Sequence, residues 1–187
     1  MYEGNDNMVM LDIEGLGVGR DAVVVSVGAV RFNLDTGKIL NTQYWDLGLK
    51  EQQRKGRVIS ADTVCWWARQ TPDVLSALTN TPRYPIEIFI KEFNQFIEGK
   101  CFFWAKGTNY DLEILTNLYQ MYDQQSPFRY SKWVDARVYY MLGKRLGILP
   151  KKERTGAHNA LADAIFQTEV VCHIHKELKD AIKARKI

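Results

Sequence analysis

The chain has 187 residues, of which 46% are hydrophobic and 25% are charged, and its formal net charge is +3. This composition fits one globular domain with a substantial core and excludes an intrinsically disordered chain. No apolar run approaches the roughly 20 residues of a membrane-spanning helix, and the N-terminus lacks the basic and apolar regions of a signal peptide, so we expect a cytoplasmic protein without membrane association.

The first predicted element is a strand over residues 8–14, with the sequence Met-Val-Met-Leu-Asp-Ile-Glu. Residues two apart share a face of a strand, so Asp12 and Glu14 point to one side and the apolar residues Leu11 and Ile13 to the other. Paired carboxylates at the rim of a core are costly unless a cation lies between them. The pair indicates either a metal site or two solvated acids at a strand end.

A meander follows. The glycine-rich turn at 15–19 has neither the lysine nor the spacing of a nucleotide-binding loop. Residues 22–32 are rich in valine and predict a second strand, 35–37 are a turn signal, and 39–47 predict a third strand. The polar and basic segment 48–57 is expected to be a loop.

Helical signals dominate the next segment. Ser60 is a plausible N-cap for a helix over residues 61–70, and Pro72 suits the first position of a second short helix. Residues 85–98 have apolar side chains at helical spacing, which predicts an amphipathic helix that packs on a sheet. Residues 101–105 then form a fourth predicted strand.

The turn over residues 106–111 leads from that strand into a helix that runs to about Tyr122. Asp111 has two interpretations at this place. It can be an acid of a functional site, or it can be the acid three residues after an N-cap Thr108 that completes a capping arrangement. Local sequence leaves both open.

One more strand and two helices complete the prediction. Residues 132–135 form a fifth short strand, and residues 136–146 form a helix that ends at Gly147. Strands followed by alternating helices and strands, without a linker or a repeat, predict a single α/β domain with a mixed sheet.

The last helix begins after the basic loop 150–156 and runs toward Lys183, with Asn159 as a possible N-cap. At about 100° per residue, Asp163 lies roughly opposite Leu161 around this helix, at the edge or outside of the buried stripe. The expected stripe is Leu161, Ala164, Ile165, Thr168 and Cys172.

The cysteines and the basic residues have less specific patterns. Cys65, Cys101 and Cys172 are odd in number and widely spaced in apolar surroundings, so we expect buried free thiols and no disulfide or zinc cluster.

Basic residues gather in four segments, which are 50–57, 144–145, 151–154 and 176–186. Each can be a solvated face or part of a nucleic-acid-binding surface.

Three short segments contain the acids in the order of one known family. They are Asp-Ile-Glu at 12–14, Asn-Tyr-Asp at 109–111, and His-Asn-Ala-Leu-Ala-Asp at 158–163. Together they resemble the three motifs of the DEDDh 3′-5′ exonucleases of the ribonuclease H-like superfamily, over about residues 8–171. The resemblance implies a ribonuclease H-like mixed β-sheet flanked by helices, in one domain over residues 1–187 with a core of about 8–175.

Two further segments are similar to one branch of that family, which includes phage exonuclease A and small bacterial and phage exoribonucleases. Asp-Ile-Glu-Gly-Leu-Gly at 12–17 is similar to the Asp-Phe-Glu-Thr-Met-Gly of this branch. Residues 66–72 are similar to its Trp-Trp-x-x-Gln-x-Pro. Gly15 departs from the family, which usually has Thr there, so only its backbone N–H could reach the 3′-hydroxyl.

The resemblance implies a two-metal site with a histidine beside it. The implied ligands are Asp12, Glu14, Asp111 and Asp163, and His158 would be the general base that takes a proton from the attacking water. Hard carboxylate oxygens select Mg²⁺ or Mn²⁺. Two such ions would stabilise both the attacking and the leaving oxygen of a phosphodiester.

Substrate contacts are also implied around this site. They are Gly15, Leu16, Asn109, Tyr110, Lys151, Lys152 and Arg154. Leu16 would wedge against the terminal base, Tyr110 would either stack on a base or pack in the core, and the basic loop would hold phosphate. Trp66 and Trp67 can be core or interface residues, or contacts to nucleic acid.

The implied activity is metal-dependent hydrolysis of single-stranded nucleic acid from its 3′ end, with release of nucleoside 5′-monophosphates and RNA slightly favoured over DNA. The alternative is a catalytically silent relative that keeps the fold as a nucleic-acid-binding or protein-interaction module. Silent relatives usually lose an acid, whereas this chain retains all four and the histidine. The expected partners are single-stranded 3′ ends and, because homodimers are common in the superfamily, a second copy of the chain.

Overall fold

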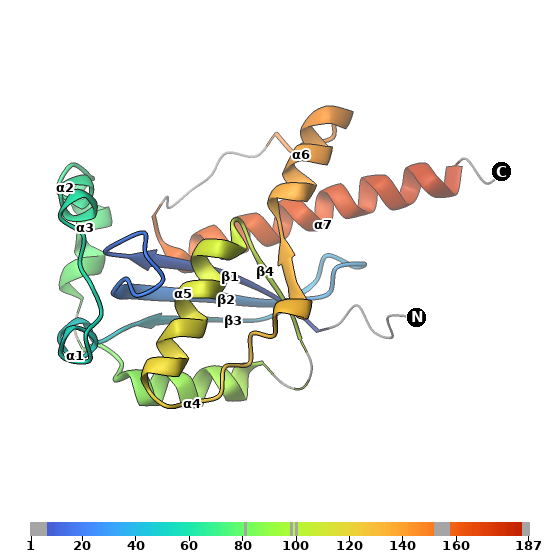
Figure 1. The fold of residues 1–187 in the computed structure, drawn as a ribbon. Helices are drawn as coiled ribbons and strands as arrows, with labels where there is room; N and C mark the ends of the chain where they lie inside the picture. The colour runs from blue at the N-terminus through green and yellow to red at the C-terminus, as the bar shows by residue number, and fades with distance from the viewer. Residues whose placement is uncertain (1–6, 81, 98, 100, 152–157, 185–187) are drawn as a thin grey trace.

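The structure, a computed structural model, describes residues 7–80, 82–97, 99, 101–151 and 158–184. Five strands form one mixed sheet in the order β3-β2-β1-β4-β5 (Figure 1). The strands are β1 (Met8–Gly15), β2 (Val24–Phe32), β3 (Ile39–Asp46), β4 (Phe102–Ala105) and β5 (Trp133–Asp135). Each begins and ends within two residues of its predicted bounds. β1 and β2 pair antiparallel, as do β2 and β3, whereas β1 pairs parallel with β4 and β4 with β5, so the predicted mixed α/β sheet is confirmed.

Helices cover both faces of this sheet. They are α1 (Leu49–Arg54), α2 (Ala61–Trp67), α3 (Pro72–Thr79), α4 (Ile86–Phe96), α5 (Thr108–Met121), α6 (Arg137–Leu146) and α7 (Ala160–Ala184), with a short 3₁₀ turn at Tyr130–Lys132. α4 and α5 pack on one face, α6 and α7 pack on the other, and α1, α2 and α3 gather at one end of the sheet (Figure 1). Among the described residues, no helix combines the length and apolarity needed to cross a bilayer.

Strand β1 is buried on both faces, as a central strand between two helical layers should be. Val9, Leu11 and Ile13 pack into the core on the α4 and α5 side, whereas Met8 and Met10 pack into the core on the α7 side. The two acids at the end of the strand continue the row of Met8 and Met10 and therefore face α7. The alternation predicted for this strand is confirmed.

The start of α7 lies directly on the sheet because Gly28 of β2 has no side chain. Gly28 is the partner of Asp12 in the β1–β2 pairing. A Cβ atom added to Gly28 would lie 2.3 Å from the backbone of Ala160, so any larger residue would push the helix away. This close approach places the first turn of α7 beside the acids of β1.

The segment 48–57 was predicted to be a loop, and this prediction is wrong for its first half, which forms α1. The buried Gln52 explains the helix, because its side-chain amide donates to the Val24 carbonyl at 2.7 Å and accepts from the Val24 N–H at 2.8 Å. Arg57 is only 3% exposed, and its guanidinium donates to the Ala22 carbonyl at 2.9 Å. One member of this basic segment is thus part of the core and not of a solvated face.

The cysteine prediction is correct in part. Cys101 and Cys172 are buried and free, whereas Cys65 is free but exposed. Cys65 lies on α2, which buries Trp67 against the sheet and leaves most of its other side chains outward. A short helix at the end of the sheet has only one face to bury, so an apolar neighbourhood in the sequence did not imply burial.

Candidate active site

Three carboxylates converge between β1 and α7. Asp12, Glu14 and Asp163 each offer one oxygen, and these oxygens lie within 4.8 Å of one another. Asp163 was predicted at the edge or outside of the buried stripe, but it is only 1% exposed. The stripe that faces the sheet includes Ala160, Asp163, Ala164, Gln167, Thr168 and Val171. It therefore contains three polar residues, and hydrophobic periodicity alone counts two of them, Asp163 and Gln167, as outward.

Asp111 approaches the same place from the first turn of α5. It is 5% exposed, and its Oδ1 accepts a hydrogen bond of 3.0 Å from the N–H of Ile13, the residue between the two acids of β1. Burial, with the charge of Asp12 adding to it, raises the pKa of Asp111 well above its usual range. The N-cap of α5 is Gly107, with no side-chain cap hydrogen bond, so the proposed capping role of Asp111 with Thr108 is wrong.

This acid set fits Mg²⁺ or Mn²⁺. Hard oxygen donors without sulfur or imidazole in the cluster are the ligands that these ions prefer. Burial is the main cause of the raised pKa of Asp111, and repulsion from the negative charges of Asp12 and Glu14 adds to it. A divalent cation would remove this repulsion, so the donor chemistry and the electrostatics agree.

Tyr110 closes the turn that follows β1. Its hydroxyl donates a hydrogen bond of 3.1 Å to the Gly17 carbonyl, and burial together with the charge of Asp111 raises its pKa. A Cβ atom at Gly15 would lie 2.7 Å from this hydroxyl. The tyrosine thus occupies space that a side chain at position 15 would need.

We expect Gly15→Ala to lower the free energy of unfolding by about 1–3 kcal/mol, because the new methyl group overlaps the hydroxyl of Tyr110. The same replacement should cost less in a Tyr110→Phe background, where the hydroxyl is absent. Urea unfolding of the four proteins measures this coupling, which should reach roughly 0.5 kcal/mol or more. An equal cost of Gly15→Ala in both backgrounds would show that the two residues do not compete for space.

His158 lies just before α7, as predicted, and has a left-handed backbone with φ of 63°. Asn159 caps the helix, since its Oδ1 accepts from the Ala162 N–H at 3.0 Å. The imidazole meets Trp66 of α2 edge to face, with 4.9 Å between the ring centres. This contact was not predicted from the sequence, because Trp66 and His158 are far apart in the chain and lie in two separate motifs.

The tryptophan pair divides into two roles. Trp67 is 1% exposed and donates a hydrogen bond of 3.0 Å from Nε1 to the Gly15 carbonyl, so it supports the turn after β1. Trp66 is 40% exposed and stands between His158 and an open pocket. Trp67 therefore confirms the core interpretation, whereas Trp66 is available for contact with a ligand.

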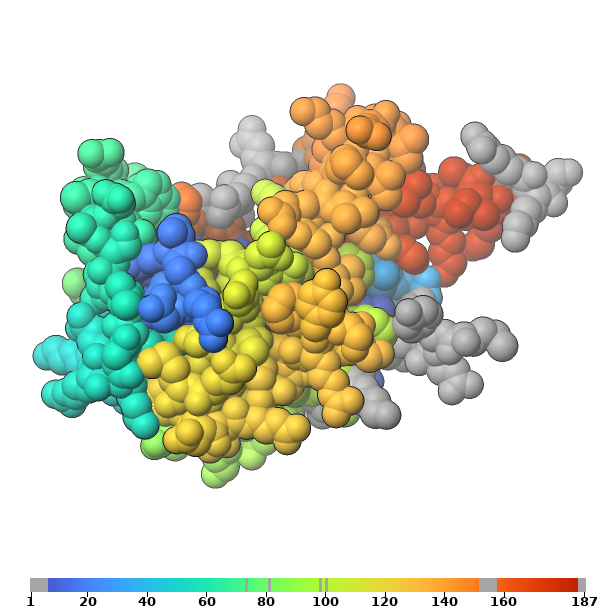
Figure 2. Space-filling view, viewed as in Figure 1, coloured from blue at the N-terminus to red at the C-terminus, as the bar shows by residue number. Residues whose placement is uncertain are grey.

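The pocket beside Trp66 has a volume of about 340 Å³. Its lining is Ile13, Glu14, Gly15, Gly17, Val18, Asp62, Thr63, Trp66 and Tyr110. In Figure 2 the turn after β1, in blue, is exposed between the helices in teal and α5 in yellow. Leu16 is 5% exposed and packs with Val23 and Trp67, whereas Val18 is 84% exposed. Val18, and not Leu16, is therefore the exposed apolar side chain of this turn.

A second, polar pocket of about 220 Å³ lies on the other side of the acids. It is lined by Asp12, Lys106, Tyr140, Asp163, Phe166 and Gln167. The ammonium group of Lys106 lies 4.9 Å from the ring centre of Tyr140. Gln167 comes four residues after Asp163, and this helical spacing is the signal by which the sequence could have assigned it to the site.

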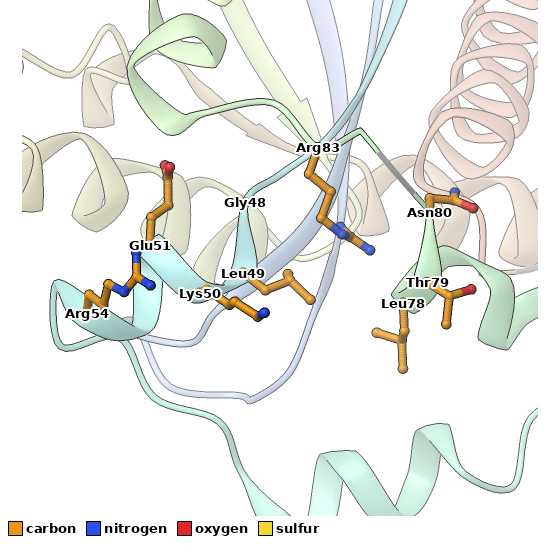
Figure 3. Close-up of a pocket in the computed structure, with 9 residues that line it drawn as sticks. All are labelled: Gly48, Leu49, Lys50, Glu51, Arg54, Leu78, Thr79, Asn80 and Arg83. Carbon is orange, nitrogen blue, oxygen red and sulfur yellow. The ribbon is translucent and has the colours of Figure 1, made fainter.

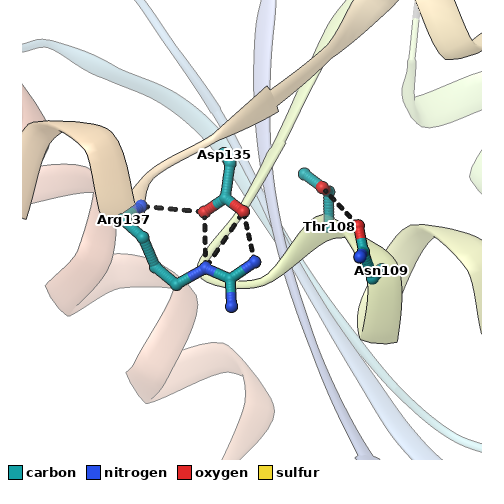
Figure 4. Close-up of polar contacts among 4 residues, drawn as sticks. All are labelled: Thr108, Asn109, Asp135 and Arg137. Carbon is teal, nitrogen blue, oxygen red and sulfur yellow. Dashed lines mark hydrogen bonds and ion pairs between the residues drawn. The ribbon is translucent and has the colours of Figure 1, made fainter.

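The entrance to α5 is joined to the neighbouring strand β5 by a hydrogen bond from the Gly107 backbone to Asp135. Arg137 donates to Asp135 through its backbone N–H at 2.9 Å and its guanidinium at 2.5–3.0 Å, and Thr108 donates to Asn109 at 3.5 Å (Figure 4). Burial raises the pKa of Asp135, but the hydrogen bonds from Arg137 outweigh it and lower that pKa on balance. Asn109 is exposed at this entrance, as a substrate contact would have to be.

The predicted phosphate contacts on the basic loop fall at the edge of the described residues. Lys151 is exposed, whereas Lys152 and Arg154 lie outside the described residues.

A further cavity of about 420 Å³ lies between α1 and α3 (Figure 3). Lys50 and Arg83 line it, and none of the predicted site residues does. The acids and the two pockets beside them are thus the candidate active site.

Residues 7–175 match the family model described as a 3′-5′ exoribonuclease Rv2179c-like domain. No curated protein matches the sequence significantly.

Among solved structures, the chain is similar to the zinc-bound E. coli ExoI–ssDNA complex, with a TM-score of 0.67 and 14% identity over 92% of this chain and 41% of that chain. It is also similar to the nuclease domain of 3′hExo, a DEDDh family member bound to rAMP, with a TM-score of 0.61 and 13% identity over 96% and 94% of the two chains. For Exonuclease X in complex with 5′ overhanging duplex DNA the TM-score is 0.55, with 17% identity over 91% and 92%. These likenesses confirm the predicted ribonuclease H-like exonuclease fold.

Proposed function

This chain belongs to the family of 3′-5′ exoribonuclease Rv2179c-like domains, and on that premise we propose that it is a metal-dependent 3′-5′ exonuclease that releases nucleoside 5′-monophosphates from single-stranded ends. The observation that carries the proposal is the convergence of Asp12, Glu14 and Asp163 within 4.8 Å, beside a pocket with an exposed tryptophan and a tyrosine. RNA is the favoured substrate, because the family description names an exoribonuclease.

The acids would hold two Mg²⁺ or Mn²⁺ ions, with Asp111 as the fourth ligand beside the three that converge. Ions bound there would neutralise charge on the phosphate and on the leaving 3′-oxygen. The protein's own contribution is to fix the acids: β1 presents two of them on one face, and α7 presents the third because Gly28 lets the helix lie on the sheet.

His158 would take the proton from the attacking water. It is half-buried and lies two residues before the start of α7, the helix that carries Asp163. Trp66 contacts one edge of the ring and so limits the directions in which it can turn. Tyr110 would not serve as the base, because its raised pKa keeps the hydroxyl protonated.

The terminal nucleoside would occupy the pocket of about 340 Å³, which has a suitable size and apolar walls. The base would contact Val18, Trp66 and Tyr110 of the lining. The two aromatic side chains could stack on any base. The Gly15 backbone would face the sugar, and Asn109 with the basic residues Lys151, Lys152 and Arg154 would contact the remaining strand. Leu16 would support the pocket from beneath, because it is buried.

Oligonucleotides labelled at the 5′ or the 3′ end test this proposal. Single-stranded RNA labelled at the 5′ end should shorten one nucleotide at a time in Mg²⁺ or Mn²⁺, whereas a 3′ label should leave at once as a mononucleotide. Chelator should stop both. Hydrolysis rates of single- and double-stranded RNA and DNA, measured at one salt concentration, show which substrate the protein prefers. Release of a 5′-labelled mononucleotide at the start would contradict the direction, and binding without any cleavage would support the silent module instead.

The homodimer and the cytoplasmic location stay predictions. Light scattering of the purified protein measures the mass in solution and tests the first. Fractionation of cells that make the protein tests the second.

A further inference from the structure

Gln167 of α7 is hydrogen-bonded to the first acid of the site. It lies one helical turn after Asp163 and is 6% exposed. Its Nε2 donates to Oδ1 of Asp12 at 2.7 Å. One helix thus supplies both an acid of the cluster and the donor that holds the acid of the facing strand.

The orientation of this amide follows from its partner. An ionised carboxylate only accepts hydrogen bonds, so the NH₂ group of Gln167, and not its oxygen, must face Asp12. The amide oxygen Oε1 is buried and has no hydrogen-bond partner among the described residues. A buried acceptor without a partner is unfavourable, and such a group in a native structure calls for an explanation other than stability.

We propose that Gln167 is a positioning residue for the metal site. Its hydrogen bond fixes the rotation of the Asp12 carboxylate, so that one oxygen of Asp12 stays within 4.8 Å of those of Glu14 and Asp163. Groups that hydrogen-bond to metal ligands in this way orient them, and their loss weakens metal binding. The inference rests on the metal site of the proposed function.

The test replaces Gln167 by Met, which keeps the length and the burial of the side chain but removes the donor. Mn²⁺ binding is measured by calorimetry on the full chain without nucleic acid, and the hydrolysis rate is measured against Mn²⁺ concentration. The dissociation constant for Mn²⁺ and the concentration for half-maximal rate should both rise by about 10–100-fold. High Mn²⁺ should restore most of kcat, because the variant would still bind the ions when they are in excess.

Thr168→Val is the matched control. Thr168 is the next residue of α7, is fully buried, and donates only to the Ala164 carbonyl of its own helix at 2.8 Å. Its replacement should lower the melting temperature and leave the affinity for Mn²⁺ unchanged. A structural defect in α7 would affect both variants alike, so a change confined to Gln167→Met supports positioning.

Gln167→Asn keeps the amide but shortens its reach, and it should weaken Mn²⁺ binding in the same direction as Gln167→Met. If Gln167→Met does not fold, the dissociation constant of Gln167→Asn for Mn²⁺ tests the proposal in its place. Wild-type affinity for Mn²⁺ in either folded variant would overturn the inference while the proposed function stands. Absence of both Mn²⁺ binding and hydrolysis in the wild-type protein would instead overturn the proposed function.

Discussion

Asp12→Asn should lower the rate of nucleic-acid hydrolysis by about 10³-fold or more, because stabilisation by bound metal contributes several kcal/mol to the transition state and each 1.4 kcal/mol is tenfold. The substitution keeps the volume of the side chain and removes the charge that faces Glu14 and Asp163. Initial rates on single-stranded RNA at saturating Mn²⁺ measure the effect. Asp180→Asn, at an exposed acid near the far end of α7, is the control and should keep the wild-type rate.

The same variant should be more stable than the wild-type protein in the absence of metal. The pKa of Asp111 is raised in the folded state by burial and by the charge of Asp12, so the stability that the protonated Asp111 contributes is lost as the pH rises through that folded pKa. Removing the charge of Asp12 lowers the folded pKa and returns part of this stability at neutral and alkaline pH. Thermal unfolding in chelator against pH measures it. A lower melting temperature at every pH, or retained Mn²⁺-dependent hydrolysis, would refute the assignment of Asp12.

His158→Ala should slow turnover by about 10²–10⁴-fold, the usual contribution of general-base catalysis, with little change in the affinity for substrate or Mn²⁺. His158 precedes α7 and is not a member of the carboxylate cluster, so its loss should leave Asp12, Glu14 and Asp163 in place. Single-turnover rates separate this loss of chemistry from a loss of binding.

The pH profile distinguishes a base from a binding residue. A histidine base gives kcat an ascending limb with rising pH, and this limb should be present in the wild-type protein and missing in His158→Ala. His173→Ala is the control, because His173 is an exposed histidine of α7. If His158→Ala kept its rate but lost affinity for metal or substrate, the histidine would be a ligand, and another group would have to take the proton.

Elements with local signals could be predicted from the order of residues alone. The alternation along β1 assigned Asp12 and Glu14 to one face, and the structure has them there. Asn159 was a possible N-cap of α7 on sequence grounds, and its side chain makes that hydrogen bond. Such features depend on neighbours within a few residues, so the spacing and the type of the residues are enough to predict them. The three motifs likewise located the acids, because each motif is a short continuous segment.

Features that depend on contacts between distant segments could not be predicted in this way and became clear only from the folded chain. The helix α1 is stabilised by hydrogen bonds between the Gln52 side chain and the backbone of Val24, which is 28 residues away in the chain. The burial of Asp163 depends on how closely α7 lies on the sheet, which Gly28 of another strand permits. The bond between Gln167 and Asp12 joins residues 155 positions apart. Hydrophobic periodicity counts a polar side chain as outward, and only the packing of α7 on the sheet shows that Asp163 and Gln167 are buried.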